Sequence, residues 1–435
     1  MEWFEALAIL IGAILVLMAI GMPVALAFLA ANILGAWVFM GGERGVAQLL
    51  NNGFGSLTKY ALMPIPLFLL MGEIFFYTGL GGRMFNAIDK LLGKLPGRLS
   101  YVTVLGGTAF STLSGSSMGS TALLGSLMVP EMSRRGYKSH MSIGPILGTG
   151  GLAIIIPPSA LAVLLATLAQ IDVAALLLAG VIPGLILAGF YIATIWLQTK
   201  IDPNAAPPYD VPSMSLTEKI VLLLREVIPM IGIMVVIIIL MIQGIVTPSE
   251  AAAFGALGVL LLAAVFKCLT WDALRKSIVG ALRVTLMAYL IVFGSATFSQ
   301  ILAFSGASRG LVKWATSFDL APLAMLMIMF AVLLLLGMFM EQISIMLLTV
   351  PIFFPLAQSL GFDLVWFGLI MLLSLEISFT TPPFGLLLFV MKGVAPSRTT
   401  MREIYTSAFP FIGCSLLLVA LLVAFPGLAL WLPAQ

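Results

Sequence analysis

The sequence predicts an all-α, polytopic membrane protein, because of its composition, its long apolar runs and two broken segments. Hydrophobic residues make up 61% of the 435 residues and charged residues only 9%, whereas about 25% of the residues in a soluble domain are charged. Apolar runs of about 20 residues, the length of a transmembrane helix, recur along the chain and leave no room for a soluble domain of about 50 residues. Two of these runs are interrupted by a Pro-Pro pair, at Pro157-Pro158 and at Pro382-Pro383.

The first half of the chain opens with runs that we expect to cross the membrane. The first run should be a retained helix, because the residues before it lack the basic start of a cleavable signal peptide. Residues 43–59 are too polar to span and predict a helix in the interface, and residues 79–98 predict a Gly-rich, basic loop. Uninterrupted spans are expected at residues 4–20, 22–40, 60–78 and 174–197.

Residues 101–132 predict a re-entrant hairpin, which enters and leaves the membrane on one face. The segment is apolar, but a run of Ser, Thr and Gly at residues 111–121 interrupts its middle. Basic residues lie in the loops on both sides of it, so both loops are expected in the cytoplasm by the positive-inside rule. A broken span is expected at residues 141–170, around the first Pro-Pro pair.

The second half of the chain predicts the same kinds of element in the same order. Residues 201–226 are polar and rich in proline, and we interpret them as a cytoplasmic linker. A second hairpin is expected at residues 320–356, interrupted at residues 337–342, and a second broken span at residues 365–391. A basic amphipathic stretch covers residues 271–283, and uninterrupted spans are expected at residues 228–244, 250–266, 284–303 and 405–431.

An internal repeat is indicated by residues that recur at an offset of 225 positions. The matching pairs are Pro23 with Pro248, Pro130 with Pro355, Gly136 with Gly361, and Pro157-Pro158 with Pro382-Pro383. An odd number of crossings is expected between the two broken helices, so the second repeat should be inverted relative to the first. The repeats are assigned to residues 1–200 and 227–435, with the linker between them.

Breaks in membrane helices predict where ions or substrate bind. A break leaves carbonyl and amide groups without partners, and these are tolerated where they line a polar cavity. Carbonyls and hydroxyls suit Na⁺, and freed helix N-termini suit an anion. The alternative is that these small residues serve only for helix packing. The candidates are Ser111, Ser114, Ser116, Ser117 and residues 153–159 in the first half, and Gly337, Ser378, Thr380 and Thr381 in the second.

Three carboxylates, Glu73, Glu341 and Glu376, fall within apolar segments. A charge at membrane depth is costly and is by default a hypothesis of function. Each carboxylate is expected to bind a cation, relay a proton or hydrogen-bond a broken backbone end, and the sequence leaves these alternatives open.

Enzyme function is disfavoured by the motifs. The chain lacks a Walker A phosphate loop, a GxSxG elbow and an HExxH pair. Cys268 and Cys414 are far apart, His140 is the only histidine, and the basic residues fall in loops and form no nucleic-acid patch. We expect no cofactor and no nucleic-acid partner. An intramembrane enzyme acting on a lipid-linked substrate through Glu73, Glu341 or Glu376 is kept as an alternative.

Four motifs together resemble the large membrane subunit of tripartite ATP-independent periplasmic (TRAP) transporters. They are residues 114–117 (SGSS), 156–159 (IPPS), 337–341 (GMFME) and the pair 375–377 (LEI) with 381–385 (TPPFG). The resemblance covers essentially the whole chain. It implies an inverted-repeat elevator fold, with scaffold and transport domains interleaved across both repeats, and no enzyme activity.

The resemblance also implies sites, partners and a location. One Na⁺ site would use Ser111, Ser114, Ala153, Ile156 and Pro158, and the other Gly337, Ser378, Thr381 and Phe384. The substrate anion would lie between them, beside Ser116, Ser117, Ser159 and Thr380, and Na⁺ would be the coupling ion.

The implied partners are a small four-helix membrane subunit and a soluble periplasmic binding protein, in a bacterial or archaeal cytoplasmic membrane. The cargo would be a dicarboxylate, a sugar acid or a sulfonate. The sequence departs from the common family pattern at Ser120, Ser374 and Ser378. These departures leave the expected fold unchanged but bear on which class of substrate is bound. A stand-alone Na⁺-coupled carboxylate transporter of similar architecture is the alternative function.

Overall fold

The computed structural model describes residues 2–93, 95–208 and 214–435, and every regular element in these ranges is a helix. Seven of the helical segments in the described ranges are long and apolar enough to cross a membrane, or eight if a bent pair counts as one span. The prediction of an all-helical polytopic membrane protein is therefore confirmed.

The N-terminal helices match the expected spans closely. Helices α1 (Trp3–Ala19) and α2 (Val24–Phe39) are apolar, and α3 (Glu43–Leu57) is the amphipathic helix expected between spans. Helix α4 (Pro64–Tyr77) begins at a proline, which is tolerated because a first-turn N–H has no partner within the helix.

The loop predicted at residues 79–98 is wrong for most of its length, because the structure has helix α5 (Leu80–Leu92) there. The glycines at its two ends, Gly79 and Gly93, have positive φ and mark the helix boundaries. Between them, Met84, Phe85 and Ile88 form a buried apolar face at helical spacing. This face stabilises a helix among the basic residues that had indicated a loop.

The first expected hairpin is a pair of helices in contact, α6 (Arg98–Ser114) and α7 (Ser117–Arg134). Gly115 ends α6 in the left-handed region at φ 61°, and its N–H donates to Ser111 O at 2.9 Å. Ser116 caps the N-terminus of α7, with its Oγ accepting the Gly119 N–H at 3.1 Å. The chain therefore turns back within two residues.

The first broken span consists of α8 (Ser139–Ile155) and α9 (Ala160–Ala169), which differ in direction by 46°. It is followed by α10 (Val173–Ala179) and α11 (Val181–Ile201), which together form one candidate span over Val173–Ile201, as expected for residues 174–197. The interruption falls at Gly180, where a Cβ atom would lie 1.9 Å from Ile155 O. Gly180 therefore lies in close contact with the end of α8.

The linker is shorter than predicted. A helix begins at Leu216, where Ser215 and Glu218 form a capping box, and it continues as α12 (Leu216–Leu222), a π-helical turn (Leu223–Val227) and α13 (Ile228–Ile242). Pro229 cannot donate a hydrogen bond to the preceding turn, and a π-turn accommodates such a disturbance. Residues 209–213 of the predicted linker lie outside the described ranges.

Helix α14 (Pro248–Val265) is followed by α15 (Trp271–Phe304), which has 34 residues. The amphipathic stretch and the span predicted at residues 271–283 and 284–303 are therefore one helix, about 51 Å long at about 1.5 Å per residue. Helix α16 (Ala307–Thr316), which the sequence did not predict, connects it to the second hairpin.

The second hairpin and broken span follow in the predicted order. Helices α17 (Pro322–Gly337) and α18 (Gln342–Ser359) contact each other, although α18 alone also meets the length and apolarity criteria for a span. The chain then forms α19 (Leu364–Thr380), a break at residues 381–385, α20 (Leu386–Val394), α21 (Met401–Ala424) and the short α22 (Gly427–Leu430).

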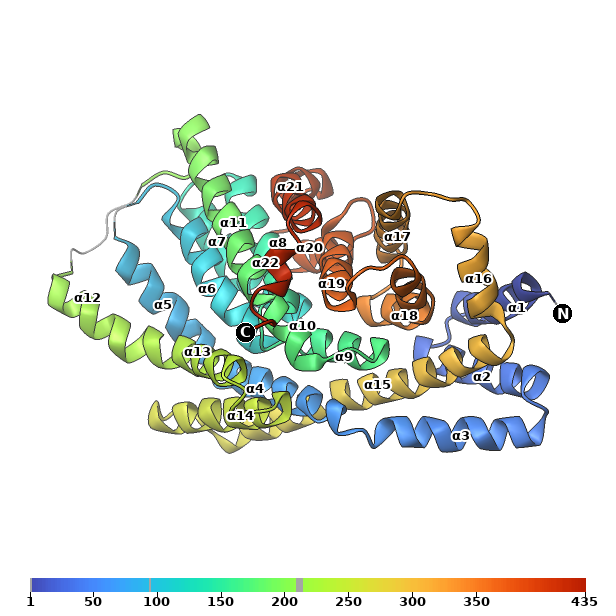
Figure 1. Cartoon of the computed structure of the whole chain (residues 1–435). Coiled ribbons are helices and arrows are strands. Elements are labelled where there is room, and N and C mark those ends of the chain that lie inside the picture. The colour runs from blue at the N-terminus through green and yellow to red at the C-terminus, as the bar shows by residue number, and fades with distance from the viewer. Residues whose placement is uncertain (1, 94, 209–213) are drawn as a thin grey trace.

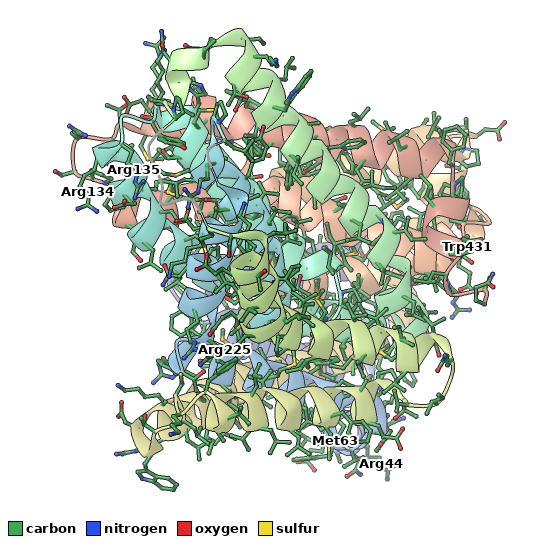
Figure 2. The ribbon with its side chains drawn as sticks, turned by 90° about the vertical axis from the view of Figure 1, so that its left-hand side faces the viewer. Arg44, Met63, Arg134, Arg135, Arg225 and Trp431 are labelled. Atoms are coloured by element: carbon green, nitrogen blue, oxygen red, sulfur yellow. The ribbon has the colours of Figure 1, made fainter. Side chains whose placement is uncertain are left out.

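The first halves of the two broken spans lie at the centre of the molecule. All residues of α8 from Met141 to Ile155 are buried, as are all residues of α19 from Trp366 to Thr380. Helices α3, α4, α14 and α15 form the lower border in Figure 1, where α15 contacts α3 and α4 packs against α14. Arg134 and Arg135 lie at one edge of the molecule in Figure 2 and Trp431 at the opposite edge.

Candidate ion and substrate site

The carboxylate of Glu376 on α19 lies where the two hairpins meet. Its Oε2 atom accepts from Ser117 Oγ at 3.4 Å and from Gln342 Nε2 at 3.3 Å. Ser117 is the first residue of α7 and Gln342 the first residue of α18, so each donor comes from the tip of a different hairpin. The residue is only 3% exposed, so these polar contacts are made away from solvent.

Helix α8 approaches Glu376 from the other side through glycine. A Cβ atom at Gly151 would lie 2.4 Å from Glu376 Oε1, and one at Gly150 would lie 2.6 Å from Thr121 Oγ1 on α7. These positions admit no side chain without displacement of a neighbour. The two glycines therefore allow α8 to pack closely against both Glu376 and α7.

The break between α8 and α9 is closed by its own hydroxyl group. Ser159 is 1% exposed, and its Oγ donates to Ile154 O at 2.8 Å while accepting the Ala162 N–H at 3.2 Å. Ile156 ends α8 in an extended conformation, and the Pro157-Pro158 peptide bond is cis, as is that of Pro382-Pro383.

The residues predicted for the first ion site lie on α6 and on the α8 break. Ser111, Ala153 and Ile156 are all buried, and Pro158 lies in the buried turn after α8. Helices α6 and α8 contact each other. The side chain of Ser114 lies outside the part that the structure describes. This ion site remains a prediction.

The residues predicted for the second ion site are partly brought together. A Cβ atom at Gly337 would lie 1.8 Å from Ser378 Oγ, so the end of α17 is in direct contact with α19. Ser378 O accepts the Thr381 N–H at 3.2 Å, and Thr381 Oγ1 donates to Ile377 O at 2.6 Å. Phe384 is 48% exposed, and its ring centre lies 5.5 Å from that of Phe339.

A cavity of about 230 Å³ lies between the two hairpin tips and helices α4, α9 and α15. Residues 115–118 from the first tip and residues 341–343 from the second line it, and Glu73 reaches it from α4. None of its described lining residues is Lys, Arg or His. Both hairpin tips therefore face α4, α9 and α15 across this cavity.

The carboxylates in this cavity differ in their contacts. Glu341 directly precedes α18, and its Oε1 accepts from Ser344 Oγ at 3.1 Å. Glu73 lies over Gly280 of α15, where a Cβ atom would lie 2.7 Å from Glu73 Oε2. Of the predicted substrate residues, Ser116 and Ser117 line the cavity, whereas Ser159 is held within the α8 break.

Thr380 points to a different and smaller cavity, of about 10 Å³, together with Glu376, Tyr191 and Ser415. Its hydroxyl group donates to Ile377 O at 3.0 Å. Glu376 Oε1 lacks a hydrogen-bond partner among the described residues. Thr380 and Ser116 therefore line different cavities, and a substrate site shared by them remains a prediction.

A third cavity, of about 510 Å³, lies at the base of the first hairpin and includes His140, Lys138 and Arg398. Arg398 Nη2 donates to Ser133 Oγ at 2.6 Å. Lys138 also pairs with Asp202 and holds the pKa of that carboxyl below its usual value. The cavity has a largely polar lining, which includes Ser133, the residue before Arg134.

Comparison with known proteins identifies the family. The family profile described as "Tripartite ATP-independent periplasmic transporter, DctM component" matches residues 11–428. The chain is 31% identical over 385 residues to the C4-dicarboxylate TRAP transporter large permease protein DctM of Pseudomonas aeruginosa, covering 87% of this chain and 88% of the relative. It is 28% identical over 431 residues to the isethionate TRAP transporter permease protein DctMQ of Oleidesulfovibrio alaskensis, covering 97% of this chain and 65% of that protein.

A solved structure shares the fold. The YdaH transporter of Alcanivorax borkumensis superposes with a TM-score of 0.61 at 13% identity, covering 90% of this chain and 91% of that chain. Together with the family profile and the apolar helices, these similarities show that the chain belongs to the large membrane subunits of the TRAP transporters and is a multi-pass protein of the inner membrane.

Proposed function

We propose that the chain is the translocation subunit of a Na⁺-coupled, binding-protein-dependent secondary importer of a small organic anion. The observation that carries the proposal is the contact of Glu376 with Ser117 and Gln342, which brings both hairpin tips to one buried point. A transport site assembled from two hairpins and two broken helices offers carbonyls, hydroxyls and helix N-termini in one place.

The two halves are proposed to be inverted repeats. In both halves a contacting helix pair, α6–α7 or α17–α18, precedes a helix that breaks at a Pro-Pro pair. This common order supports the relation, as does the offset of 225 residues between the two Pro-Pro pairs. Inversion would make the first hairpin open to the cytoplasm and the second to the outside.

Na⁺ is proposed to bind where each hairpin tip faces a helix break. Carbonyl oxygens with nearby hydroxyl groups are ligands of the type that coordinates Na⁺ at unwound helices. In the second half, Gly337, Ser378, Thr381 and Phe384 supply such oxygens, and in the first half Ser111, Ser114, Ala153, Ile156 and Pro158 do so. The bound cations would offset the negative charge of the substrate anion.

An elevator mechanism is proposed for the movement of the substrate. The cavity of about 230 Å³ has the hairpin tips on one side and α4 and α15 on the other. A sliding movement of the tip-bearing helices past α4 and α15 would carry the cavity contents across the membrane. Helix α15, with 34 residues, is long enough to border such a path throughout.

The proposed cargo and partners follow from the relatives. The names of those relatives include a C4-dicarboxylate and isethionate, which is a sulfonate, so we propose a dicarboxylate, a sugar acid or a sulfonate as cargo. We propose a small four-helix membrane subunit and a periplasmic binding protein as partners. The isethionate relative supports the first partner, because its name describes one fused protein.

Uptake by purified protein in proteoliposomes tests this function. Vesicles containing this chain and its small subunit, supplied with loaded binding protein, should take up substrate only under an inward Na⁺ gradient. Replacement of Na⁺ by K⁺ is the matched control. Equal uptake in the two salts would contradict the coupling.

A stand-alone Na⁺-coupled carboxylate transporter is the second candidate. Uptake by this chain alone, without the small subunit and binding protein, would favour it. An intramembrane enzyme is disfavoured, because the relatives are named as permeases.

A further inference from the structure

One carboxylate contacts all the parts that the proposed function assigns to ion binding. Glu376 extends from α19, which carries the second break, and accepts hydrogen bonds from the first residues of α7 and α18. It also lies against Gly151 of α8, which carries the first break. Both hairpins and both broken helices thus meet at a single side chain.

The two hydrogen bonds converge on the same oxygen atom. Ser117 Oγ and Gln342 Nε2 both donate to Oε2, at 3.4 and 3.3 Å. A buried carboxylate that loses a donor is left with an uncompensated desolvation cost. When one hairpin tip moves away, the Glu376 carboxylate loses one of its two hydrogen bonds. The carboxylate is then held less firmly, and so is its hydrogen bond to the other tip.

Close packing around Glu376 restricts movement of its side chain when only one hairpin tip moves. It is 3% exposed, and its Oε1 and Cγ atoms lie 2.4 Å from where a Cβ atom at Gly151 would be. Tight packing of this kind favours two discrete arrangements over gradual adjustment. The side chain is suited to transmit the position of one tip to the other.

We propose that Glu376 is a positioning residue that couples the two hairpin tips, so that Na⁺ binding at one ion site raises the affinity of the other. The proposal rests on the proposed Na⁺-coupled function. Ser117 moves with the first hairpin tip and Gln342 with the second. Glu376 Oε2 connects the two tips because it accepts a hydrogen bond from each residue. Coupling of this kind typically changes affinity by about 5- to 150-fold.

The coupling depends on an acceptor oxygen at residue 376 and is independent of its charge. Glu376→Gln retains a side-chain oxygen that accepts both hydrogen bonds, whereas Glu376→Met has similar length without that acceptor. A direct Na⁺ ligand would behave differently, because loss of the charge in Glu376→Gln would weaken binding as Glu376→Met does.

The test measures the Na⁺ dependence of uptake by the full chain with its small subunit and loaded binding protein. The unmodified chain and Glu376→Gln should give a Hill coefficient for Na⁺ of about 2, the number of proposed sites. Glu376→Met should give about 1, with half-saturation at least about fivefold higher. Glu43→Gln, an exposed position on α3, is the control for removal of a carboxylate and should match the unmodified chain.

A second set of variants keeps the test valid if Glu376→Met does not fold. Ser117→Ala and Gln342→Leu each remove one donor and should each lower the Hill coefficient, while the double variant should be no worse than either alone. An unchanged Hill coefficient in these variants overturns the proposal, as does a Glu376→Gln variant as impaired as Glu376→Met. Uptake by the unmodified chain that ignores Na⁺ contradicts the proposed function itself, which distinguishes the two failures.

Discussion

Gly337 lies directly against Ser378, and a Cβ atom at Gly337 would lie only 1.8 Å from Ser378 Oγ. This contact joins the end of the first arm of the second hairpin to the helix that breaks at Thr381. Ser378 is fully buried and its hydroxyl group donates to Leu375 O at 2.7 Å, so the serine side chain lies between two elements that cannot easily separate.

Gly337→Ala is therefore expected to abolish Na⁺-dependent uptake, because the added methyl group overlaps Ser378. Uptake in proteoliposomes and the yield of folded protein check the result. The double variant Gly337→Ala/Ser378→Gly removes the hydroxymethyl group that causes the overlap and should restore much of the yield of folded protein. Full activity of the single variant would contradict the contact.

Gly180→Ala is expected to destabilise the protein. The added Cβ atom would meet Ile155 O at 1.9 Å, and a backbone oxygen cannot rotate away as a flexible side chain can. Overpacking costs about 1–3 kcal/mol. The midpoint of thermal unfolding in detergent should fall.

Gly189→Ala on α11, the helix that follows Gly180, is the matched control for Gly180→Ala. No atom lies within 4 Å of a Cβ at Gly189, and alanine is the better helix former by about 0.5–1 kcal/mol. Its midpoint should stay the same or rise. A similar decrease for both variants would argue against the close approach of Gly180 to α8.

Thr381→Ala and Ser114→Ala are expected to weaken the Na⁺ dependence of uptake while the fold is kept. Loss of one ligand worth about 1.4 kcal/mol raises half-saturation about tenfold, and uptake at saturating Na⁺ should remain. Titration of uptake with Na⁺ measures the change. Thr316→Ala, an exposed threonine whose hydroxyl group likewise bonds its own helix, should match the unmodified chain, and unchanged titrations for Thr381→Ala and Ser114→Ala would refute the ion sites.

Glu73→Gln is expected to lower the KM for an anionic substrate. Glu73 and Glu341 both line the cavity of about 230 Å³, and Glu73 forms no ion pair or hydrogen bond among the described residues. Removal of one negative charge should lower the KM about three- to tenfold, which corresponds to about 1 kcal/mol of repulsion. The effect should shrink with added salt.

Initial rates of uptake at two ionic strengths measure the effect of Glu73→Gln, with Glu43→Gln as control. A higher KM in Glu73→Gln would instead indicate that Glu73 attracts a cationic group of the substrate.

The breaks in the helices could be predicted from sequence, because each is marked locally. Pro-Pro pairs and Ser- or Gly-rich runs within apolar segments locate the tips at Gly115 and Gly337 and the breaks at Pro157 and Pro382 to within a few residues. Helix α5 was not predicted, because its basic residues indicated a loop while its buried face stabilises a helix. The single helix α15 was predicted as two elements, an amphipathic stretch and a span, because its basic residues end where the apolar run begins.

The contacts of Glu376 could not be predicted, because they join residues far apart in the chain. Ser117 and Glu376 are separated by 259 residues, and no local pattern relates them. Gln342 belongs to the predicted interruption at residues 337–342, but the sequence does not indicate its contact with Glu376. Nothing in the sequence around Gly151, apart from the neighbouring Gly150, predicts its close approach to Glu376.

The coupling of Na⁺ to substrate is tested most directly by Na⁺ influx into proteoliposomes that contain this chain and its small subunit. Radioactive Na⁺ outside the vesicles should enter when loaded binding protein is added, in a fixed ratio to the substrate taken up. Empty binding protein should cause no such influx. Substrate uptake without accompanying Na⁺ influx would contradict the proposal that the two hairpin tips bind Na⁺ as the coupling ion.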